Sequence, residues 1–294
     1  MASNLRSWVV AARPKTLTAA VIPVLVGTSL AVSDHATVNW LFFILPLLGA
    51  ILIQIGTNLV NDAIDFRKGT DTAERLGPLR VTQAGLLTHQ RVMAGAWICF
   101  GVAIVVGIPI VLRGGTAFIV IGLASILAAY LYTGGPYPLA YHGLGDVFVI
   151  VFFGLIAVGG TYYLQTLAYS FGAIVGGLSM GFLATVLLAV NNLRDHQGDA
   201  LSGKRTLAVR FGVRGAQAEI AILSIAPFAM SALWLLKGQW LAFVLPIVAL
   251  PLALRVIRSS QIDQGRSLNR TLGTAAALHA AYGLMFSIGL LIPT

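Results

Sequence analysis

The sequence has little charge and a single cysteine. Only 10% of its 294 residues are Asp, Glu, Lys or Arg, whereas 57% are hydrophobic, and the mean hydropathy is +0.87. An ordinary soluble domain carries about 25% charged residues, so a water-soluble globule is excluded. Cys99 lies in the apolar run WICFGVAIVVG. A single cysteine excludes a disulfide framework and a cysteine-based metal site. Its apolar neighbours are typical of a small buried hydrophobic side chain.

The charge that is present is mostly positive. Nineteen Lys and Arg stand against ten Asp and Glu, which gives a net charge of +9. Taken alone, this excess is compatible with nucleic acid or with an anionic membrane surface. The hydropathy favours the lipid bilayer, and we expect no nucleic-acid partner.

Long apolar runs divide the chain into candidate membrane helices. About 20 apolar residues are needed for a helix to cross the hydrocarbon core, and nine segments bounded by charges or turn residues meet this need. They lie near residues 16–33, 40–60, 92–112, 116–133, 146–167, 170–193, 216–236, 240–257 and 271–292. We therefore expect an all-α polytopic membrane protein with nine transmembrane helices.

The basic residues predict the orientation of these helices. Seventeen of the nineteen Lys and Arg lie before the first span or after the second, sixth and eighth spans, which leaves only Arg113 and Lys237 for the opposite side. Positive residues concentrate in cytoplasmic loops. We expect an integral protein of the cytoplasmic (inner) membrane, with its N-terminus in the cytoplasm and its C-terminus outside.

The acidic residues gather in two short segments. Six of the ten lie between Asn58 and Arg80 or between Asn191 and Gly212, each segment following a membrane span on the cytoplasmic side. The spacings i, i+3 and i, i+4 place the members of each pair on one face of a helical continuation. Two facing pairs would gather four carboxylates, which are Asp62, Asp65, Asp195 and Asp199.

Four neighbouring carboxylates need compensating cations. Hard oxygen ligands without a His or Cys cluster select Mg²⁺, which is usually shared between carboxylates and substrate phosphates. A phosphate-bearing substrate is therefore expected. The basic residues placed to take up its remaining charge are Arg67, Lys68, Lys204 and Arg205. The competing interpretation is that all these charges are solvated loop residues that pair with one another.

Four asparagines accompany the acids at depths where polar groups are costly and usually functional. An amide there binds a metal, a diphosphate oxygen or a freed backbone carbonyl, and the sequence leaves these three roles open. The four are Asn58, Asn61, Asn191 and Asn192.

The two aspartate motifs resemble a known family. Asn61-Asp62-x-x-Asp65 and Asp195-x-x-x-Asp199 are similar to the paired aspartate signature of the UbiA-type intramembrane aromatic prenyltransferases. Further stretches resemble the branch of that family that acts on 1,4-dihydroxy-2-naphthoate. They are ARPKTL from Ala12, NDAIDFRKGTD from Asn61, GPLR from Gly77, YTGGPYPLAYHGLGD from Tyr132, GTYYLQT from Gly160, NNLRD from Asn191 and GKRTLAVRFG from Gly203.

The resemblance implies an enzyme of menaquinone biosynthesis. Such an enzyme transfers a polyprenyl chain from its diphosphate to 1,4-dihydroxy-2-naphthoate with loss of CO₂, and it uses Mg²⁺. The implied fold is a single domain, residues 1–294, with nine helices around a central cavity. Asp62, Asp65, Asp195 and Asp199 would be the catalytic metal-binding residues, with Asn58 as a further metal ligand.

The first motif departs from the broader family pattern. Gly69 occupies the position of a third acid, and Asp71 follows two residues later. Asp71 either reaches the metal or orders the loop.

Other residues are assigned to the substrates. Arg13 and Lys15 either bind the acceptor carboxylate or a phosphate, or anchor the first span at the positive side. The substrate-binding set implied by the resemblance is Arg13, Lys15, Asn61, Arg67, Lys68, Arg80, Tyr132, Asn191, Asn192, Lys204 and Arg205. Aromatic faces attract cations but also anchor helices at the membrane interface. With this alternative open, the expected tunnel residues are Phe152, Phe153, Tyr162 and Tyr163.

The remaining acids and the loops have simpler interpretations. Asp146 either aids the site or caps the helix that follows it, and Asp34, Asp263 and Glu219 are assigned to solvated surface. The long connection 67–91 and the connection 204–214 are expected to fold as cytoplasmic caps over the site.

Two competing functions remain. An ion-coupled transporter also uses intramembrane acids, but here the acids cluster at one face of the membrane. A prenyltransferase for 4-hydroxybenzoate, homogentisate, a haem or a chlorin would share the aspartate motifs.

Overall fold

The computed structural model describes residues 2–34, 36–69 and 76–293, which form helices and no strands. The all-α prediction is therefore confirmed for this part of the chain. In chain order the helices are α1 (Ala2–Ala12), η1 (Pro14–Thr16), α2 (Thr18–Ser33), α3 (Leu41–Arg67), α4 (His89–Gly114), α5 (Ala117–Leu131), η2 (Leu139–Tyr141), α6 (Gly145–Val149), η3 (Ile150–Ile156), α7 (Ala157–Thr166), α8 (Phe171–Leu201), α9 (Leu207–Met230), α10 (Leu233–Leu236), α11 (Trp240–Val244), η4 (Leu245–Ala249), α12 (Leu250–Ile262), η5 (Gly265–Ser267) and α13 (Leu268–Leu291).

Each predicted membrane segment coincides with a helix or with consecutive helices. Within the described residues, seven helical stretches are long and apolar enough to cross a bilayer, and an eighth is obtained if the bent pair Leu5–Thr16 and Thr18–Ser33 is one span. The helix Ala117–Leu131 is apolar but has only 15 residues. The chain is thus an integral membrane protein, and the count of nine crossings stays a prediction.

Two helices are longer than their membrane spans. α8 has 31 residues and α3 has 27. At 1.5 Å per residue α8 measures about 46 Å, against a hydrocarbon core of about 30 Å. The last turns of both helices therefore extend beyond the apolar part. Asp62 and Asp65 lie on the last turns of α3, and Asp195 and Asp199 on those of α8, which confirms the predicted helical continuation.

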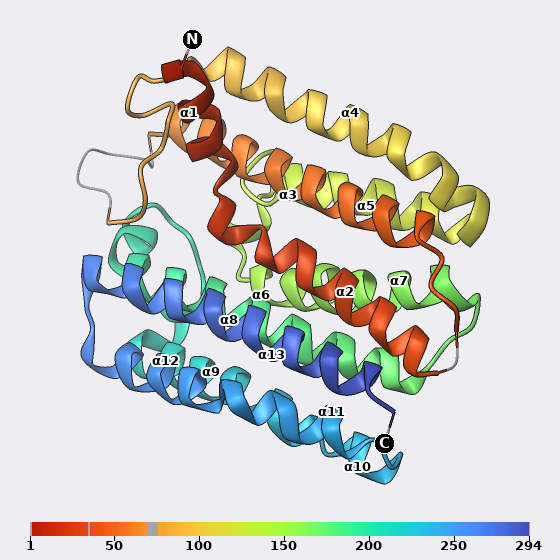
Figure 1. Ribbon diagram of the computed structural model, residues 1–294. Coiled ribbons are helices and arrows are strands. Elements are labelled where there is room, and N and C mark those ends of the chain that lie inside the picture. Colours follow the sequence, from red (N-terminus) through yellow and green to blue (C-terminus); the bar gives the residue numbers. More distant parts are fainter. Residues whose placement is uncertain (1, 35, 70–75, 294) are drawn as a thin grey trace.

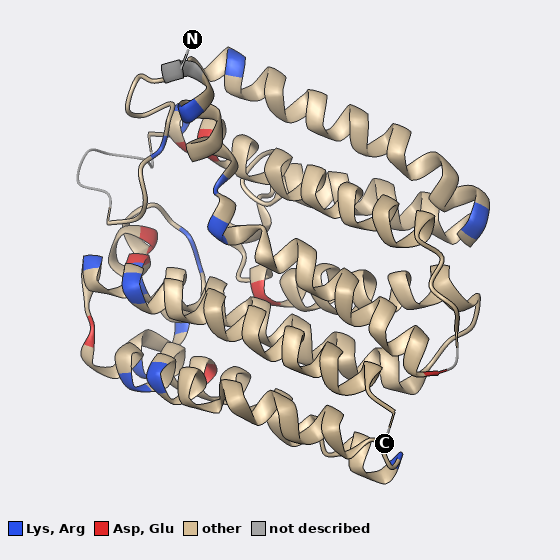
Figure 2. Cartoon of the chain, viewed as in Figure 1, with Lys and Arg blue, Asp and Glu red and all other residues tan. Residues whose placement is uncertain are grey.

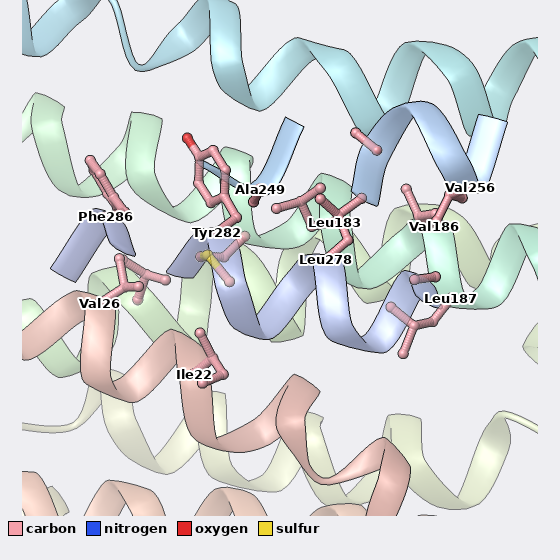
Figure 3. Close-up of a cluster of buried hydrophobic side chains, with 14 of the residues drawn as sticks. Ile22, Val26, Leu183, Val186, Leu187, Ala249, Val256, Leu278, Tyr282 and Phe286 are labelled. Atoms are coloured by element: carbon pink, nitrogen blue, oxygen red, sulfur yellow. The ribbon is translucent and has the colours of Figure 1, made fainter. Parts of the chain in front are cut away.

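The helices pack in two groups. Figure 1 shows α3, α4 and α5 on one side of α2 and α7, and α8, α9 and α13 on the other. The larger core lies in the second group, where α2, α8 and α13 meet (Figure 3). There Ile22, Leu183, Leu278, Tyr282 and Phe286 are buried against one another. This core holds α8 and α13 rigidly side by side, so their polar ends are also fixed in relation to each other.

The charged residues gather at one end of the bundle. Figure 2 shows most Lys, Arg, Asp and Glu near the end from which α1 begins, whereas the opposite end has few. At that opposite end Asp34 accepts hydrogen bonds from Tyr162 Oη (2.9 Å) and Ser170 Oγ (3.2 Å) and lies 3.8 Å from Lys237 Nζ. Asp34 is exposed, as expected from the sequence, and these contacts also make it join α2, α7 and α10.

The expected cap loops differ from each other. Most of the segment 204–214 is helical, because α9 begins at Leu207 and is only kinked at Gly212. Gly212 has φ 70°, a conformation that favours glycine. The longer connection is described from Leu76 onward and contains turns, not helix. Its Asp71 lies outside the described residues.

A close backbone approach fixes α6, η3 and α7 against α8. A Cβ atom on Gly181 of α8 would lie 2.8 Å from Ile150 O and 3.2 Å from Gly154 Cα. Both neighbours are backbone atoms of the adjoining span and cannot rotate away. Gly181 therefore sets the distance between α8 and η3, which both line the cavity described below.

We predict that Gly181→Ala destabilises the protein by about 1–3 kcal/mol, because the methyl group overpacks this contact. The measurement is thermal unfolding in detergent. Gly159→Ala on α7 is the matched control, since its Cβ would meet nothing within 4 Å, and removing a helix glycine is neutral or mildly stabilising. Equal melting temperatures for Gly181→Ala and wild type would contradict the prediction.

Candidate functional site

A cavity of about 1850 Å³ runs between the helices. Its apolar part is lined by residues of α4, α5, η3 and the membrane-embedded part of α3, and its polar part by the final turns of α3 and α8 and the loops beside them. Sequence-predicted residues that line it are Arg13, Lys15, Asn58, Asn61, Asp65, Lys68, Arg80, Tyr132, Phe152, Phe153, Asn191, Asn192, Asp195, Asp199 and Lys204. The structure thus brings together most of the predicted site.

Each of the three predicted carboxylates in the cavity lining has a basic partner. Asp65 pairs with Arg80 at 3.0 Å, and both side chains are less than one-tenth exposed. Asp199 Oδ1 lies 3.2 Å from Lys204 Nζ. Asp195 receives two hydrogen bonds from Arg194, which comes immediately before it in the sequence. Positive side chains thus compensate carboxylates that burial would otherwise make costly.

Asp62 is placed differently from the other predicted ligands. It is 1% exposed, and its two carboxylate oxygens accept hydrogen bonds from the backbone N–H groups of Val81 and Thr82, both at 3.0 Å. It is absent from the cavity lining. The structure therefore corrects the expectation for Asp62: in this arrangement it anchors the loop after α3, and the four carboxylates do not share one cluster.

Two lysines face the same aromatic ring. The Nζ atoms of Lys68 and Lys204 lie 4.7 and 5.7 Å from the ring centroid of Tyr141, within the range of cation–π attraction. Lys68 Nζ also donates to Thr133 O at 2.7 Å. Tyr141 lines the cavity, so its ring holds two positive charges beside Asp65 and Asp199.

The two lysines differ in their pKa. Burial lowers the pKa of Lys68; the carboxylate of Asp65 opposes this shift and the charge of Lys204 adds to it. Burial also acts to lower the pKa of Lys204, but the carboxylates of Asp199 and Asp65 outweigh it and hold that pKa above its ordinary value. Lys68 is therefore the first of the two to lose its charge as the pH rises.

The asparagines have unequal surroundings. Asn58 Nδ2 donates to Ala12 O and to Thr16 Oγ1, both at 3.0 Å, so its amide nitrogen fixes the turn between α1 and α2. Asn61 Oδ1 accepts from Thr133 Oγ1 at 2.8 Å. Asn191 and Asn192 line the cavity on α8. Of the three roles open from the sequence, binding a backbone carbonyl is the one observed for Asn58.

Several predicted residues lie elsewhere. Arg67 and Arg205 are exposed and outside the cavity lining, and Asp71 is outside the described residues. Tyr162 binds Asp34 at the far end of the bundle, and Tyr163 stacks on Phe118 at 5.9 Å. The tunnel assignment is therefore corrected for both tyrosines, because they do not line the cavity, whereas Phe118 does.

The cavity lining also includes three residues that the sequence did not assign to the site, which are Tyr141, Arg194 and Asn269. Tyr141 and Arg194 lie inside the quoted motifs, which is the signal that could have found them, whereas Asn269 on α13 stands in no motif. Asp146 is 7% exposed and lines the cavity; Leu144, not Asp146, is the N-cap residue of α6 and makes no side-chain cap. Glu219 is half-buried and interacts electrostatically with Asp146, which corrects the solvated-surface assignment of Glu219.

This arrangement suits a ligand with an anionic head and a long apolar body. Amides and cations line one part of the cavity and apolar side chains the rest. The donors beside the cations are carboxylate and amide oxygens, which suit Mg²⁺. In the described part of the chain no three His, Cys, Asp or Glu residues converge on one point, so a metal held here would share its coordination with the ligand.

Comparison with known proteins gives one family. The profile of the UbiA prenyltransferase family matches residues 20–287. The 1,4-dihydroxy-2-naphthoate octaprenyltransferase of Haemophilus influenzae is 36% identical over 98% of this chain and 97% of its own, and that of Escherichia coli is 38% identical over 81% and 80%. A UbiA homolog from Archaeoglobus fulgidus, solved with DMAPP and Mg²⁺, superposes with a TM-score of 0.64 at 16% identity, covering 96% of this chain and 99% of that one.

We predict that Asp62→Ala loosens the loop beginning at Val81. It leaves two buried N–H groups without their charged acceptor, each worth about 1.5–3 kcal/mol, so amide hydrogen exchange across Val81–Leu87 should rise about tenfold or more. Asp62→Asn keeps one acceptor oxygen and should give an intermediate rate. Asp34→Ala, at the other end of the bundle, is the control and should leave these amides unchanged. Wild-type exchange in Asp62→Ala would remove the anchoring role.

Proposed function

Because the chain belongs to the UbiA prenyltransferase family, we propose that it transfers a polyprenyl chain from its diphosphate to 1,4-dihydroxy-2-naphthoate, with loss of CO₂. The product is demethylmenaquinol, the reduced form of demethylmenaquinone. The observation that carries the proposal is the cavity of about 1850 Å³, with carboxylates, amides and cations in one part and apolar walls in the rest. This shape matches a substrate with a charged diphosphate and a long hydrocarbon tail. The naphthoate acceptor is inferred from the relatives named above.

The tail has a direct route from the bilayer. Several apolar residues of α4 and α5 that line the cavity keep more than half of their surface accessible: Ile104 is 52%, Ile108 53% and Leu123 58% exposed. In the proposal, the cavity opens toward the lipid on this apolar side. A polyprenyl chain enters and a lipid-soluble product leaves through this side without crossing water. Phe152 and Phe153 of η3 also line the cavity and would contact the polyprenyl chain.

The reaction balances without an oxidant. The bond between C1 of the allylic chain and the diphosphate oxygen breaks, and its electron pair leaves with the diphosphate. A bond forms between C1 and the ring carbon that bears the carboxylate. That carboxylate then departs as CO₂, and the electron pair of its bond restores the aromatic ring.

The side chains at the polar end would stabilise the leaving diphosphate. Arg80, Lys204 and Lys68 are already held in the cavity wall, so they present positive charge with little reorganisation, which is how preorganised sites lower a barrier. Asp65, Asp195 and Asp199 do not converge on one point in the described structure, so these carboxylates would share the coordination of Mg²⁺ with the diphosphate. When bound, the metal would neutralise charge on the departing oxygens.

Orientation follows from the same charges. The polar end of the cavity coincides with the end of the bundle where most Lys and Arg gather (Figure 2). By the positive-inside rule we place this end on the cytoplasmic side of the cytoplasmic membrane, with α1 in the cytoplasm and the end of α13 outside. The water-soluble diphosphate would then be released on the cytoplasmic side.

The direct test is incubation of the purified protein in detergent with 1,4-dihydroxy-2-naphthoate, a polyprenyl diphosphate and Mg²⁺. We expect CO₂, pyrophosphate and a prenylated product by mass spectrometry, and loss of product with EDTA. Asp195→Asn should lower kcat about 10²-fold or more, because one charge that organises the leaving group is lost. Asp263→Asn is the control, since Asp263 only accepts a hydrogen bond from Thr271. Product from 4-hydroxybenzoate but not from the naphthoate would replace the acceptor in the proposal.

A pH profile tests the role of Lys68. Only the protonated amine binds a diphosphate, and burial lowers its pKa. The apparent affinity for the polyprenyl diphosphate should therefore fall as the pH rises through the alkaline range, earlier than an ordinary lysine would predict. Lys68→Arg keeps its charge at high pH, so the fall should shift to higher pH. An unshifted profile would assign the alkaline loss to another group.

A further inference from the structure

The last helix contributes a polar side chain to the cavity wall. Asn269, in the first turn of α13, accepts a hydrogen bond from Arg194 Nη1 at 2.7 Å through its Oδ1. Its Nδ2 donates to the backbone carbonyl of Leu76 at 2.8 Å. One amide thus joins α8, α13 and the loop that follows α3, three segments far apart in the sequence.

Both polar atoms of the Asn269 amide make a hydrogen bond, and these two bonds allow only one orientation of the amide. A guanidinium only donates hydrogen bonds and a backbone carbonyl only accepts them, so Oδ1 must face Arg194 and Nδ2 must face Leu76. Aspartate would keep the bond to Arg194 but lose the bond to Leu76. Leucine, of similar size, would lose both. The geometry therefore requires asparagine at position 269.

On the α8 side, the Asn269 amide orients Arg194, and Arg194 in turn orients Asp195. Arg194 is 5% exposed and uses Nε and Nη2 on the two oxygens of Asp195, at 2.8 and 2.6 Å. Its Nη1 donates to Asn269 Oδ1. With three of its donors engaged on two fixed partners, the guanidinium has one orientation, and the carboxylate of Asp195 is held in the cavity wall.

On the loop side, the Asn269 amide fixes the start of the segment that carries Arg80, through its bond to Leu76. Leu76 precedes Arg80 by four residues, and immediately after Arg80 the N–H groups of Val81 and Thr82 are bound by Asp62. The segment that carries Arg80 is therefore tied at its start to α13 and at its end to α3. Arg80 lies between these ties and pairs with Asp65.

We propose that Asn269 is a positioning residue, which ties the Leu76–Arg80 segment to Arg194. This tie keeps Arg80, which would bind the diphosphate, in register with Asp195, which would hold the metal bound to that diphosphate. The identity of that ligand rests on the proposed function. Asn269 acts through its two partners and takes no part in bond breaking. Its loss should therefore weaken binding of the polyprenyl diphosphate more than it slows the chemical step.

The kinetic test compares Asn269→Asp with Asn269→Leu. Both lose the bond to Leu76, so both should raise KM for the polyprenyl diphosphate about fivefold to tenfold, the effect of about one hydrogen bond. kcat in Asn269→Asp should stay within about twofold, because its bond to Arg194 is kept. Thr274→Ala, which loses only a hydroxyl bond to the Arg270 carbonyl of its own helix, should match wild type. A higher KM in Asn269→Asp alone would overturn the proposal, because it would reflect the added charge.

A second measurement needs no substrate. Hydrogen exchange of a peptide spanning residues 76–82 should be faster in both Asn269 variants than in wild type and Thr274→Ala, in detergent without ligands. If exchange is faster in both Asn269 variants but the wild-type protein does not prenylate the naphthoate, the structural role of Asn269 is supported and the proposed function is rejected. Wild-type exchange and wild-type KM in both variants of an active enzyme would reject the tie and leave the proposed function standing.

Discussion

The site depends on one constraint: a carboxylate at the edge of a bilayer must have a partner. Asp65, Asp195 and Asp199 lie on the last turns of two long helices, where water is scarce, and each is matched by a cation within 3.2 Å. A buried charge that loses its partner costs several kcal/mol. This need for compensation, more than any loop preference, explains why basic residues from three separate segments converge on the same end of the cavity.

On the proposed function, the same ion pairs would rearrange when the ligand binds. In the described structure Arg80 and Lys204 neutralise Asp65 and Asp199. A divalent metal and a diphosphate together would supply charge of both signs, so the basic side chains would pair with phosphate oxygens and the carboxylates with the metal. One set of ion pairs would then replace another, and neither set would leave an isolated charge in the cavity wall. The exchange requires the partners to stay in register, which is what the ties around Arg80 provide.

Much of the fold and of the site could be predicted from the sequence, because the signals were strong and local. The apolar runs located each membrane helix, and the spacings Asp62 to Asp65 and Asp195 to Asp199 predicted helical turns beyond the membrane. Motif residues such as Asp65, Lys204 and Tyr132 do line the cavity. In a chain with only ten acids, few positions are available for charged chemistry, so position alone carried much of the information.

The failures share a physical cause. Whether Asp62 faces the cavity or the loop depends on where Val81 and Thr82 lie, 19 and 20 residues away. Helix periodicity predicts only contacts between residues a few positions apart, so it could not predict this one. Tyr162 shares a motif with cavity residues such as Thr161, but its hydroxyl reaches Asp34, which the chain folds back to the far end of the bundle. Asn269 stands alone between Leu268 and Arg270, and only the packing of α13 against α8 gives it a role. A tie between distant segments is a property of the tertiary structure, so its residues become recognisable only once the helices are assembled.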